Sequence, residues 1–273
     1  MLFTVLGAHG FVGSHLLARL SDQGHRVHAP AREDQSWLDE NLGHVFYCVG
    51  LTNDFYDRPF DTVEAHSALL ARVLRAGRFE RLVYLSSTRL YDALPDDCVN
   101  ESTVLQLDTA NPRSLYDLSK SLGENLCLNH SGDRACVARL SCVYSDTLRE
   151  GGFLAQVLPR ALSGETFTLD SSAAYARDYV HIDDVTALLQ DMLVGAGNGI
   201  YNVCAGGNTS NEQLMMELRR ITGARVTCSR TDTQHMPRVS NGKASQAFGF
   251  RPRQLLDHLP AMLERLKGSN HGA

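Results

Sequence analysis

The sequence contains no long hydrophobic run, which is the first limit on what the protein does. No apolar stretch approaches the ~18 residues that a membrane-spanning helix requires, so we expect no membrane segment. Basic clusters are also missing, and the formal net charge at pH 7 is −5. Because nucleic acids are bound through concentrated Lys and Arg side chains, we expect no nucleic-acid partner. A basic pocket for a phosphorylated small molecule is compatible with this charge.

Paired cysteine motifs are absent as well. The seven cysteines are scattered along the chain, and none has the Cys-x-x-Cys spacing of a zinc or redox site, so we expect no metal centre. An odd number of cysteines without a recognisable signal peptide is typical of a reducing compartment. We therefore expect a cytoplasmic protein in which most thiols are small buried side chains.

The first thirteen residues carry the most informative pattern. A short apolar run over residues 2–6 precedes glycines at positions 7, 10 and 13, and a helical pattern follows. In such a strand–turn–helix unit, Gly7 allows a tight turn, Gly10 lets the backbone approach a pyrophosphate, and Gly13 lets the helix pack closely on the strand. The helix N-terminus offers N–H groups and a positive dipole end to phosphates. The pattern predicts a dinucleotide site, and a plain structural turn is the alternative.

Residues 24–32 predict a turn and a second strand, whose end is where a dinucleotide-binding fold reads the ribose. An acid there would hydrogen-bond the 2′-hydroxyl of NAD, but position 31 is Ala and position 32 is Arg. No carboxylate repels a 2′-phosphate at this point, and the Arg32 guanidinium is available to bind one. The sequence therefore favours NADP(H), with NAD(H) as the alternative. The alternative is that Arg32 is a solvated loop residue. The acids at positions 33 and 34 also argue against a bound 2′-phosphate.

Strand and helix patterns alternate over the first half of the chain. Residues 45–50 and 82–87 predict buried strands, residues 33–43 one short helix, and residues 60–78 a helix that ends at Gly77. Continuous apolar strands separated by helices indicate an α/β fold with a doubly wound parallel sheet of the Rossmann type. The short link between the second and third apolar runs indicates that one usual strand is shortened or lost.

The composition changes near residue 145, after which Gly, Ser and Asp become more frequent. We therefore expect a dinucleotide-binding domain over residues 1–145 and a smaller substrate-binding lobe over residues 146–267. Parts of the second segment, near residues 183–193 and 200–204, are expected to return to the main sheet. Residues 268–273 predict a disordered tail.

Two groups of polar residues suggest chemistry. Tyr116 and Lys120 are four apart in a helical pattern and share one face. A phenol has a pKa of ~10, and a nearby ammonium lowers it, so this pair can exchange a proton with an alcohol or ketone. Ser86 and Ser87 end a predicted strand, where open α/β sheets hold ligands. A solvated surface pair and loop-capping serines are the alternatives.

Together these motifs resemble the extended branch of the short-chain dehydrogenase/reductase superfamily, the NAD-dependent epimerase/dehydratase family, which acts largely on nucleotide sugars. The resemblance covers most of the chain. It includes the glycine motif, Ser-Ser-x-x-x-Tyr at 86–91, Tyr-x-x-x-Lys at 116–120, and the segments 138–144, 177–185 and 199–203.

The resemblance implies a role for each residue. Tyr116 would be the general acid–base, Lys120 would lower the pKa of Tyr116 and hold the nicotinamide ribose, and Ser87 would orient the carbonyl. Arg177 would contact the diphosphate of a sugar nucleotide, with a surface salt bridge as the alternative. The implied cofactor-binding residues are Gly7, Gly10, Phe11, Val12, Gly13, Arg32, Tyr116 and Lys120. The implied substrate-binding residues are Ser87, Thr88, Tyr116, Cys142 and Arg177.

Departures from the family pattern narrow the activity. Dehydrating members carry an acidic pair after the catalytic hydroxyl, where this chain has Thr88 and Arg89, so dehydration is disfavoured. Cys142 replaces an asparagine that often contacts substrate, which weakens its assignment as a contact. His66 stands where a helical asparagine is usual, and we interpret it as structural.

Our hypothesis is an NADPH-dependent ketoreductase that reduces the 4-keto group of a nucleotide-linked 4-keto-6-deoxy sugar. Alternatives are a nucleotide-sugar epimerase with tightly bound NAD, a reductase of a non-sugar carbonyl, and a dinucleotide-sensing regulator without chemistry. The family also implies a homodimer through helices near 60–76 and 115–129. The apolar stripe of Leu115, Leu118, Leu122 and Leu126 fits this interface, and it fits packing on the sheet equally well.

Overall fold

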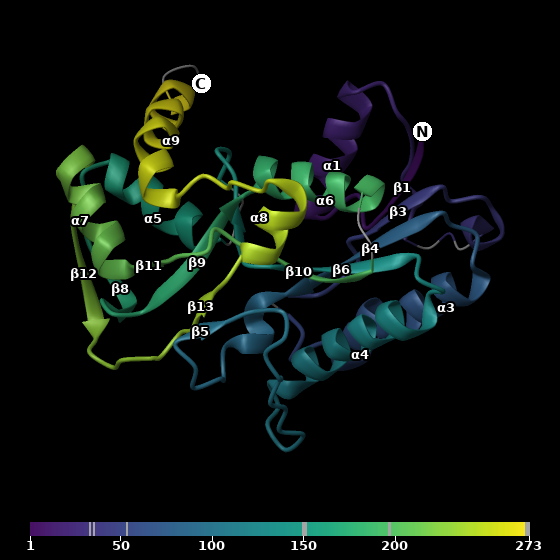
Figure 1. The fold of residues 1–273 in the computed structure, drawn as a ribbon. Helices are drawn as coiled ribbons and strands as arrows, with labels where there is room; N and C mark the ends of the chain where they lie inside the picture. Colours follow the sequence, from purple (N-terminus) through teal and green to yellow (C-terminus); the bar gives the residue numbers. More distant parts are fainter. Residues whose placement is uncertain (33, 35, 53, 149–151, 196–197, 271–273) are drawn as a thin grey trace.

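A computed structural model describes the chain except for residues 33, 35, 53, 149–151, 196–197 and 271–273. At its centre is a parallel sheet in the order β10–β6–β4–β3–β1–β2 (Figure 1). The strands are β1 (Leu2–Leu6), β2 (Arg26–His28), β3 (His44–Tyr47), β4 (Arg81–Ser87), β6 (Ala135–Leu140) and β10 (Gly199–Val203). This arrangement confirms the predicted α/β fold with a Rossmann-type parallel sheet.

Helices cover both faces of this sheet (Figure 1). Helices α1 (Phe11–Asp22) and α6 (Ile182–Gly195) pack on one face through Leu16, Leu20 and Leu189. Helices α3 (Leu69–Ala76) and α4 (Ser114–His130) pack on the other face through Leu70 and Cys127. The central strands contribute to both hydrophobic clusters, which explains their continuous apolar sequences.

Two of the expected local structures differ from the prediction. Residues 36–39 form only a single 3₁₀ turn, η1 (Ser36–Asp39), instead of a helix over 33–43. Residues 59–76 are helical, but the path is divided into α2 (Pro59–Val63), a π-helical turn η2 (Glu64–Ala68) and α3. The sequence indicated that one usual strand is shortened or lost, and among the described residues the central sheet ends at β2.

The second half of the chain builds a smaller lobe and also adds β10 and α6 to the main layers. The strands of the lobe form a three-stranded sheet, β11–β9–β7, and a parallel pair, β12–β8. Their bounds are β7 (Cys142–Tyr144), β8 (Thr166–Ser172), β9 (Ala176–His181), β11 (Asn208–Ser210) and β12 (Arg225–Arg230). Helices α5 (Phe153–Leu162), α7 (Asn211–Thr222) and α9 (Leu255–Asn270) enclose its core.

Shorter elements connect these two parts. They are the 3₁₀ turn η3 (Thr88–Tyr91), the parallel pair β5 (Cys98–Val99) with β13 (Arg238–Val239), and α8 (Gly242–Phe248), which packs beside β10. The predicted disordered tail is wrong for residues 268–270, because α9 continues through Asn270, and residues 271–273 lie outside the described part. Within the described residues, no helix is both long and apolar enough to cross a membrane.

Candidate active site

The glycine turn joins β1 to α1 in a conformation that depends on two of its glycines. Gly7 has a φ of +83°, and a Cβ there would lie 2.9 Å from the carbonyl carbon of Cys48. A Cβ on Gly13 would lie 2.2 Å from the carbonyl oxygen of Gly7. Residue Gly10 is the N-cap of α1 and is exposed. The tight turn and the close packing predicted at 7 and 13 are therefore present, and the N-terminus of α1 is open to a ligand.

A cavity of about 480 Å³ lies at the carboxyl ends of the central strands. It brings together residues that are far apart in the sequence and that sequence reasoning had selected: Gly10, Phe11, Val12, Gly13, Ser87, Thr88, Tyr116, Lys120, Cys142 and Arg177. The residues after β3, Cys48 to Gly50, form another part of its wall, which we had not predicted. Their place at the end of a parallel strand is the signal that would have found them.

Tyr116 is buried in this wall, with only 3% of its surface exposed. Burial raises the pKa of its phenol, and a hydrogen bond from the Ser87 side chain and the charge of Arg89 oppose this rise without cancelling it. The sequence had led us to expect that Lys120 lowers this pKa. In the structure the desolvation of Tyr116 outweighs its favourable contacts, so the net pKa is raised, and a lowering contribution from Lys120 stays a prediction.

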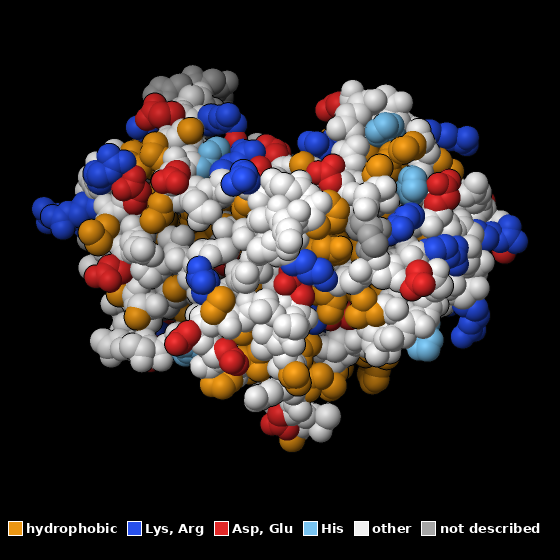
Figure 2. Space-filling view, in the orientation of Figure 1, with side chains coloured by type: hydrophobic (Ala, Val, Ile, Leu, Met, Phe, Trp, Pro, Cys, Tyr) orange, Lys and Arg blue, Asp and Glu red, His pale blue; other side chains and the backbone are white. Residues whose placement is uncertain are grey.

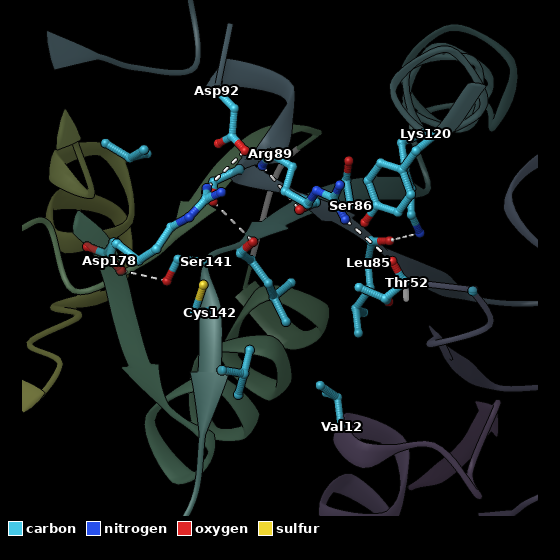
Figure 3. Close-up of a pocket in the computed structure, with 18 of the residues that line it drawn as sticks. Val12, Thr52, Leu85, Ser86, Arg89, Asp92, Lys120, Ser141, Cys142 and Asp178 are labelled. Carbon is cyan, nitrogen blue, oxygen red and sulfur yellow. Dashed lines mark hydrogen bonds and ion pairs between the residues drawn. The ribbon is translucent and has the colours of Figure 1, made fainter. Parts of the chain in front are cut away.

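Lys120 lies one turn along α4 and is also buried. Its Nζ donates a hydrogen bond to the carbonyl oxygen of Leu85 at 2.9 Å, as Figure 3 shows. Burial lowers the pKa of Lys120 to about 7, against the opposing charge of Glu124. The alternative of a solvated surface pair is therefore excluded for Tyr116 and Lys120.

A buried ion pair, missed by sequence reasoning, holds α4 against the sheet. Arg139 on β6 donates to Glu124 on α4, with Nη2 and Oε2 separated by 2.6 Å. The Ser86 hydroxyl donates to the other Glu124 oxygen at 2.5 Å, and Arg139 also donates to the Tyr91 hydroxyl at 2.6 Å. This network connects α4, which carries Tyr116 and Lys120, to β4, which ends at Ser87.

His66, which we interpreted as structural, is fully buried beside Tyr116. Its Nε2 accepts the N–H of Leu51 at 3.2 Å, so the neutral ring carries its proton on Nδ1 and donates to the Ser119 hydroxyl at 2.8 Å. The ring also packs edge-on against Tyr116, with ring centroids 5.2 Å apart. Burial lowers the pKa of His66 to about 2.

Arg177 lies at the boundary between this cavity and a second one of about 750 Å³, and it lines both. Its Nη1 is 2.9 Å from Asp92 Oδ2, which Arg113 also contacts at 2.8 Å. Two guanidinium groups thus share one carboxylate. Asp92 was not selected from the sequence, since nothing local indicates that residues 92, 113 and 177 meet.

Arg32 is not among the residues that line this cavity. It follows β2 by four positions, and its side chain is exposed. An NADP preference therefore stays a prediction.

A doubly wound sheet whose glycine turn and Ser–Tyr–Lys group share one cavity defines a dinucleotide-dependent oxidoreductase. A model of the NAD dependent epimerase/dehydratase family matches residues 3–204, and the chain belongs to this family. The resemblance noted from the motifs is thereby confirmed.

Relatives in this family modify nucleotide sugars. The chain is 26% identical to a UDP-glucose 4-epimerase of Mycolicibacterium smegmatis, over 94% of this chain and 92% of that protein. It is 21% identical to a dTDP-4-dehydro-6-deoxy-D-allose reductase of a Streptomyces species, over 92% and 91% of the two chains.

Solved structures show the same fold. MoeE5 in complex with UDP-glucose and NAD aligns with a TM-score of 0.81 at 21% identity, covering 98% of this chain and 99% of that one. RMD from Pseudomonas aeruginosa complexed with NADPH aligns with a TM-score of 0.77 at 23% identity, covering 97% and 98%.

Proposed function

We propose that this protein is an NADPH-dependent ketoreductase that reduces the 4-keto group of a nucleotide-linked sugar, with a 4-keto-6-deoxy sugar as the starting candidate. The observation that carries this proposal is the state of Tyr116. A phenol is protonated at neutral pH already at its ordinary pKa of ~10, and burial raises this pKa further; Tyr116 lies beside the Ser87 hydroxyl in a cavity that the glycine turn also lines. A protonated phenol is the form that a reduction requires.

In this mechanism Tyr116 donates its proton to the carbonyl oxygen of the substrate. The Ser87 hydroxyl hydrogen-bonds the same oxygen and fixes its orientation. A nicotinamide dinucleotide, when bound along Gly10 to Gly13 and Lys120, supplies the hydride. Lys120, whose pKa burial lowers to about 7, lies one helical turn from Tyr116 and holds the ribose.

Arg177 and the second cavity support a nucleotide-linked substrate. The Arg177 guanidinium lies where the two cavities meet, so a diphosphate bound there would connect a sugar beside Tyr116 to a nucleoside in the second cavity. Solved relatives described as complexes with UDP-glucose and with UDP-glucuronic acid agree with this class of ligand. The Streptomyces relative named as a 4-keto sugar reductase agrees with the reaction.

An epimerase with tightly bound NAD is the second candidate. Arg32 is exposed and does not line the cavity, so no contact in the described cavity supports the NADPH selectivity that would distinguish a reductase from it. The relative named as a UDP-glucose 4-epimerase agrees with this alternative.

The two candidates are separated by the fate of the dinucleotide. We expect the purified protein to oxidise added NADPH when a UDP- or dTDP-linked 4-keto sugar is supplied. Tyr116→Phe should lower kcat by about 10²–10⁴-fold, because the proton donor is removed. Tyr201→Phe is the matched control, since that ring packs on Phe248 and lies outside the two cavities.

Full turnover by Tyr116→Phe would overturn the mechanism. Release of NAD from the denatured protein, together with interconversion of two sugar nucleotides and no consumption of NADPH, would establish the epimerase instead.

A further inference from the structure

Arg89 occupies a position beside the reacting centre that the mechanism above does not use. It lies in η3, directly after the strand that ends at Ser87, and it lines the cavity. Its guanidinium carbon is 4.7 Å from the centroid of the Tyr116 ring and 5.3 Å from that of Phe55. Figure 3 shows the side chain turned toward Thr52, whose carbonyl oxygen accepts a hydrogen bond from Nη1 at 3.4 Å.

Among the described residues no carboxylate forms a salt bridge with Arg89; the nearby charge of Asp117 is felt by it but is paired with Arg113 at 3.7 Å. Three acids line the same cavity, and each is held by other groups. Asp92 is shared by two other arginines, and Asp54 pairs with Arg58 at 3.3 Å. The third, Asp178, accepts three backbone N–H groups and the Ser141 hydroxyl.

A half-buried guanidinium with one long hydrogen bond offers several donors to a ligand. It is always charged, and its planar fork matches the two oxygens of a carboxylate. A methyl or hydroxymethyl group offers no comparable partner. An anion bound by Arg89 would therefore gain charge-assisted hydrogen bonds that a neutral group cannot form.

The place of Arg89 indicates which carbon carries the anion. Tyr116 is the proton donor to the oxygen on C4, and the guanidinium lies over the ring of that same tyrosine. A substrate group that it contacts is therefore close to C4, and we assign this group to a ring neighbour of C4. In a hexose, C5 is such a neighbour and bears C6, the exocyclic carbon that occurs as a methyl, a hydroxymethyl or a carboxylate.

We infer that Arg89 binds a C6 carboxylate and that the substrate is a nucleotide-linked uronic acid or its 4-keto form. This inference rests on the proposed hydride transfer at C4, and it replaces the 6-deoxy sugar named as the starting candidate. It applies equally to the reductase and to the epimerase, because both place the same sugar carbon beside Tyr116.

The test compares sugar nucleotides that differ only at C6. Binding is measured by calorimetry for three pairs of sugar nucleotides. They are UDP-glucuronic acid and UDP-glucose, dTDP-glucuronic acid and dTDP-glucose, and GDP-mannuronic acid and GDP-mannose. The proteins are the unmodified chain, Arg89→Met, which keeps an apolar stem over Tyr116, and Arg89→Lys, which keeps the charge but loses the fork. Arg220→Met on the exposed face of α7 is the control.

We expect the acid of at least one pair to bind about tenfold or more tightly than its neutral partner. Arg89→Met should remove this preference while its affinity for the neutral sugar and for NADPH stays within about twofold, which also shows that it folds. The Lys variant should retain part of the preference, and Arg220→Met all of it.

Equal affinity for both members of every pair that binds would overturn the inference and leave the proposed function standing. A loss of affinity in Arg89→Met that is the same for acid and neutral sugars would also overturn it, because Arg89 would then only support Tyr116. Failure of every sugar nucleotide to bind the unmodified protein would overturn the proposed function, and the inference with it.

Discussion

Burial governs the proton chemistry of the individual side chains around Tyr116. It raises the pKa of Tyr116, lowers that of Lys120 to about 7 and lowers that of His66 to about 2. In each case desolvation favours the neutral form of the group. The result is a site in which a phenol is available as a proton donor at neutral pH and the histidine behind it stays uncharged.

The buried histidine has a measurable consequence for stability. An unfolded histidine has a pKa of ~6.5, whereas His66 in the folded protein has a pKa of about 2. Between these values the unfolded state binds one more proton, so folding stability falls as the pH falls, by ~1.4 kcal/mol per pH unit. In His66→Asn, urea unfolding between about pH 6 and pH 4 should show a shallower pH dependence, reduced by about this slope.

The matched control is His130→Asn, because His130 is exposed at the end of α4. Its pH dependence should be steeper than that of His66→Asn. Identical slopes for the unmodified protein and His66→Asn would show that His66 is charged in the folded state.

At the scale of elements, α4 has two distinct faces. Tyr116, Lys120, Gly123 and Glu124 are buried against the sheet and η2. The leucine stripe lies on another face: Leu115, Leu118 and Leu126 are half-buried and Leu122 is exposed. The sequence left open whether this stripe packs on the sheet; the face with the catalytic residues does, and of the stripe Leu126 packs against the same core.

Gly123 sets how closely α4 approaches the sheet. An added Cβ would lie 2.4 Å from the Tyr84 hydroxyl and 2.9 Å from the carbonyl oxygen of His66, which is too close for either atom. Gly123→Ala should therefore displace α4, lower the free energy of unfolding by about 1–3 kcal/mol and reduce kcat. Denaturant unfolding and steady-state kinetics measure the two effects.

Gly268→Ala in α9 is the control, since nothing lies within 4 Å of an added Cβ there. It should leave kcat unchanged and stabilise the helix slightly. If Gly123→Ala behaved in the same way, the close approach of α4 would be unimportant for the site.

At the scale of the whole molecule, exposed apolar side chains gather near α2 and α4. Phe60 is 88% exposed and Leu122 50% exposed, and the two helices that carry them pack side by side. Figure 2 shows apolar side chains along the lower edge of this face, over the area where Figure 1 places α4. Such a patch on a protein surface commonly marks an interface, so we retain the homodimer as a prediction.

We expect sedimentation to give twice the monomer mass, and Phe60→Glu combined with Leu122→Glu to shift the protein toward monomer. Buried like charges would face each other across a two-fold interface, which makes association unfavourable. Met216→Glu is the control, because Met216 is 67% exposed on α7, away from this patch. A monomeric unmodified protein, or equal effects of the two changes, would contradict the predicted interface.

Local features of the fold follow from the sequence because short-range sterics and periodicity encode them. The positive φ at Gly7, the shared face of Tyr116 and Lys120, and the alternation of strands and helices all depend on neighbouring residues. Most of the site residues selected from the motifs and the family resemblance line the cavity, although they are a minority of its lining residues.

Other features arise only when distant segments meet. Asp92 joins Arg113 and Arg177, and Arg89 covers Tyr116, although these residues are separated by long stretches of chain. The direction of the Tyr116 pKa shift likewise depends on the desolvation produced by everything packed around it, which no local pattern contains. The glycine turn and the catalytic pair could therefore be recognised in advance, whereas the arrangement of charges around Tyr116 required the folded chain.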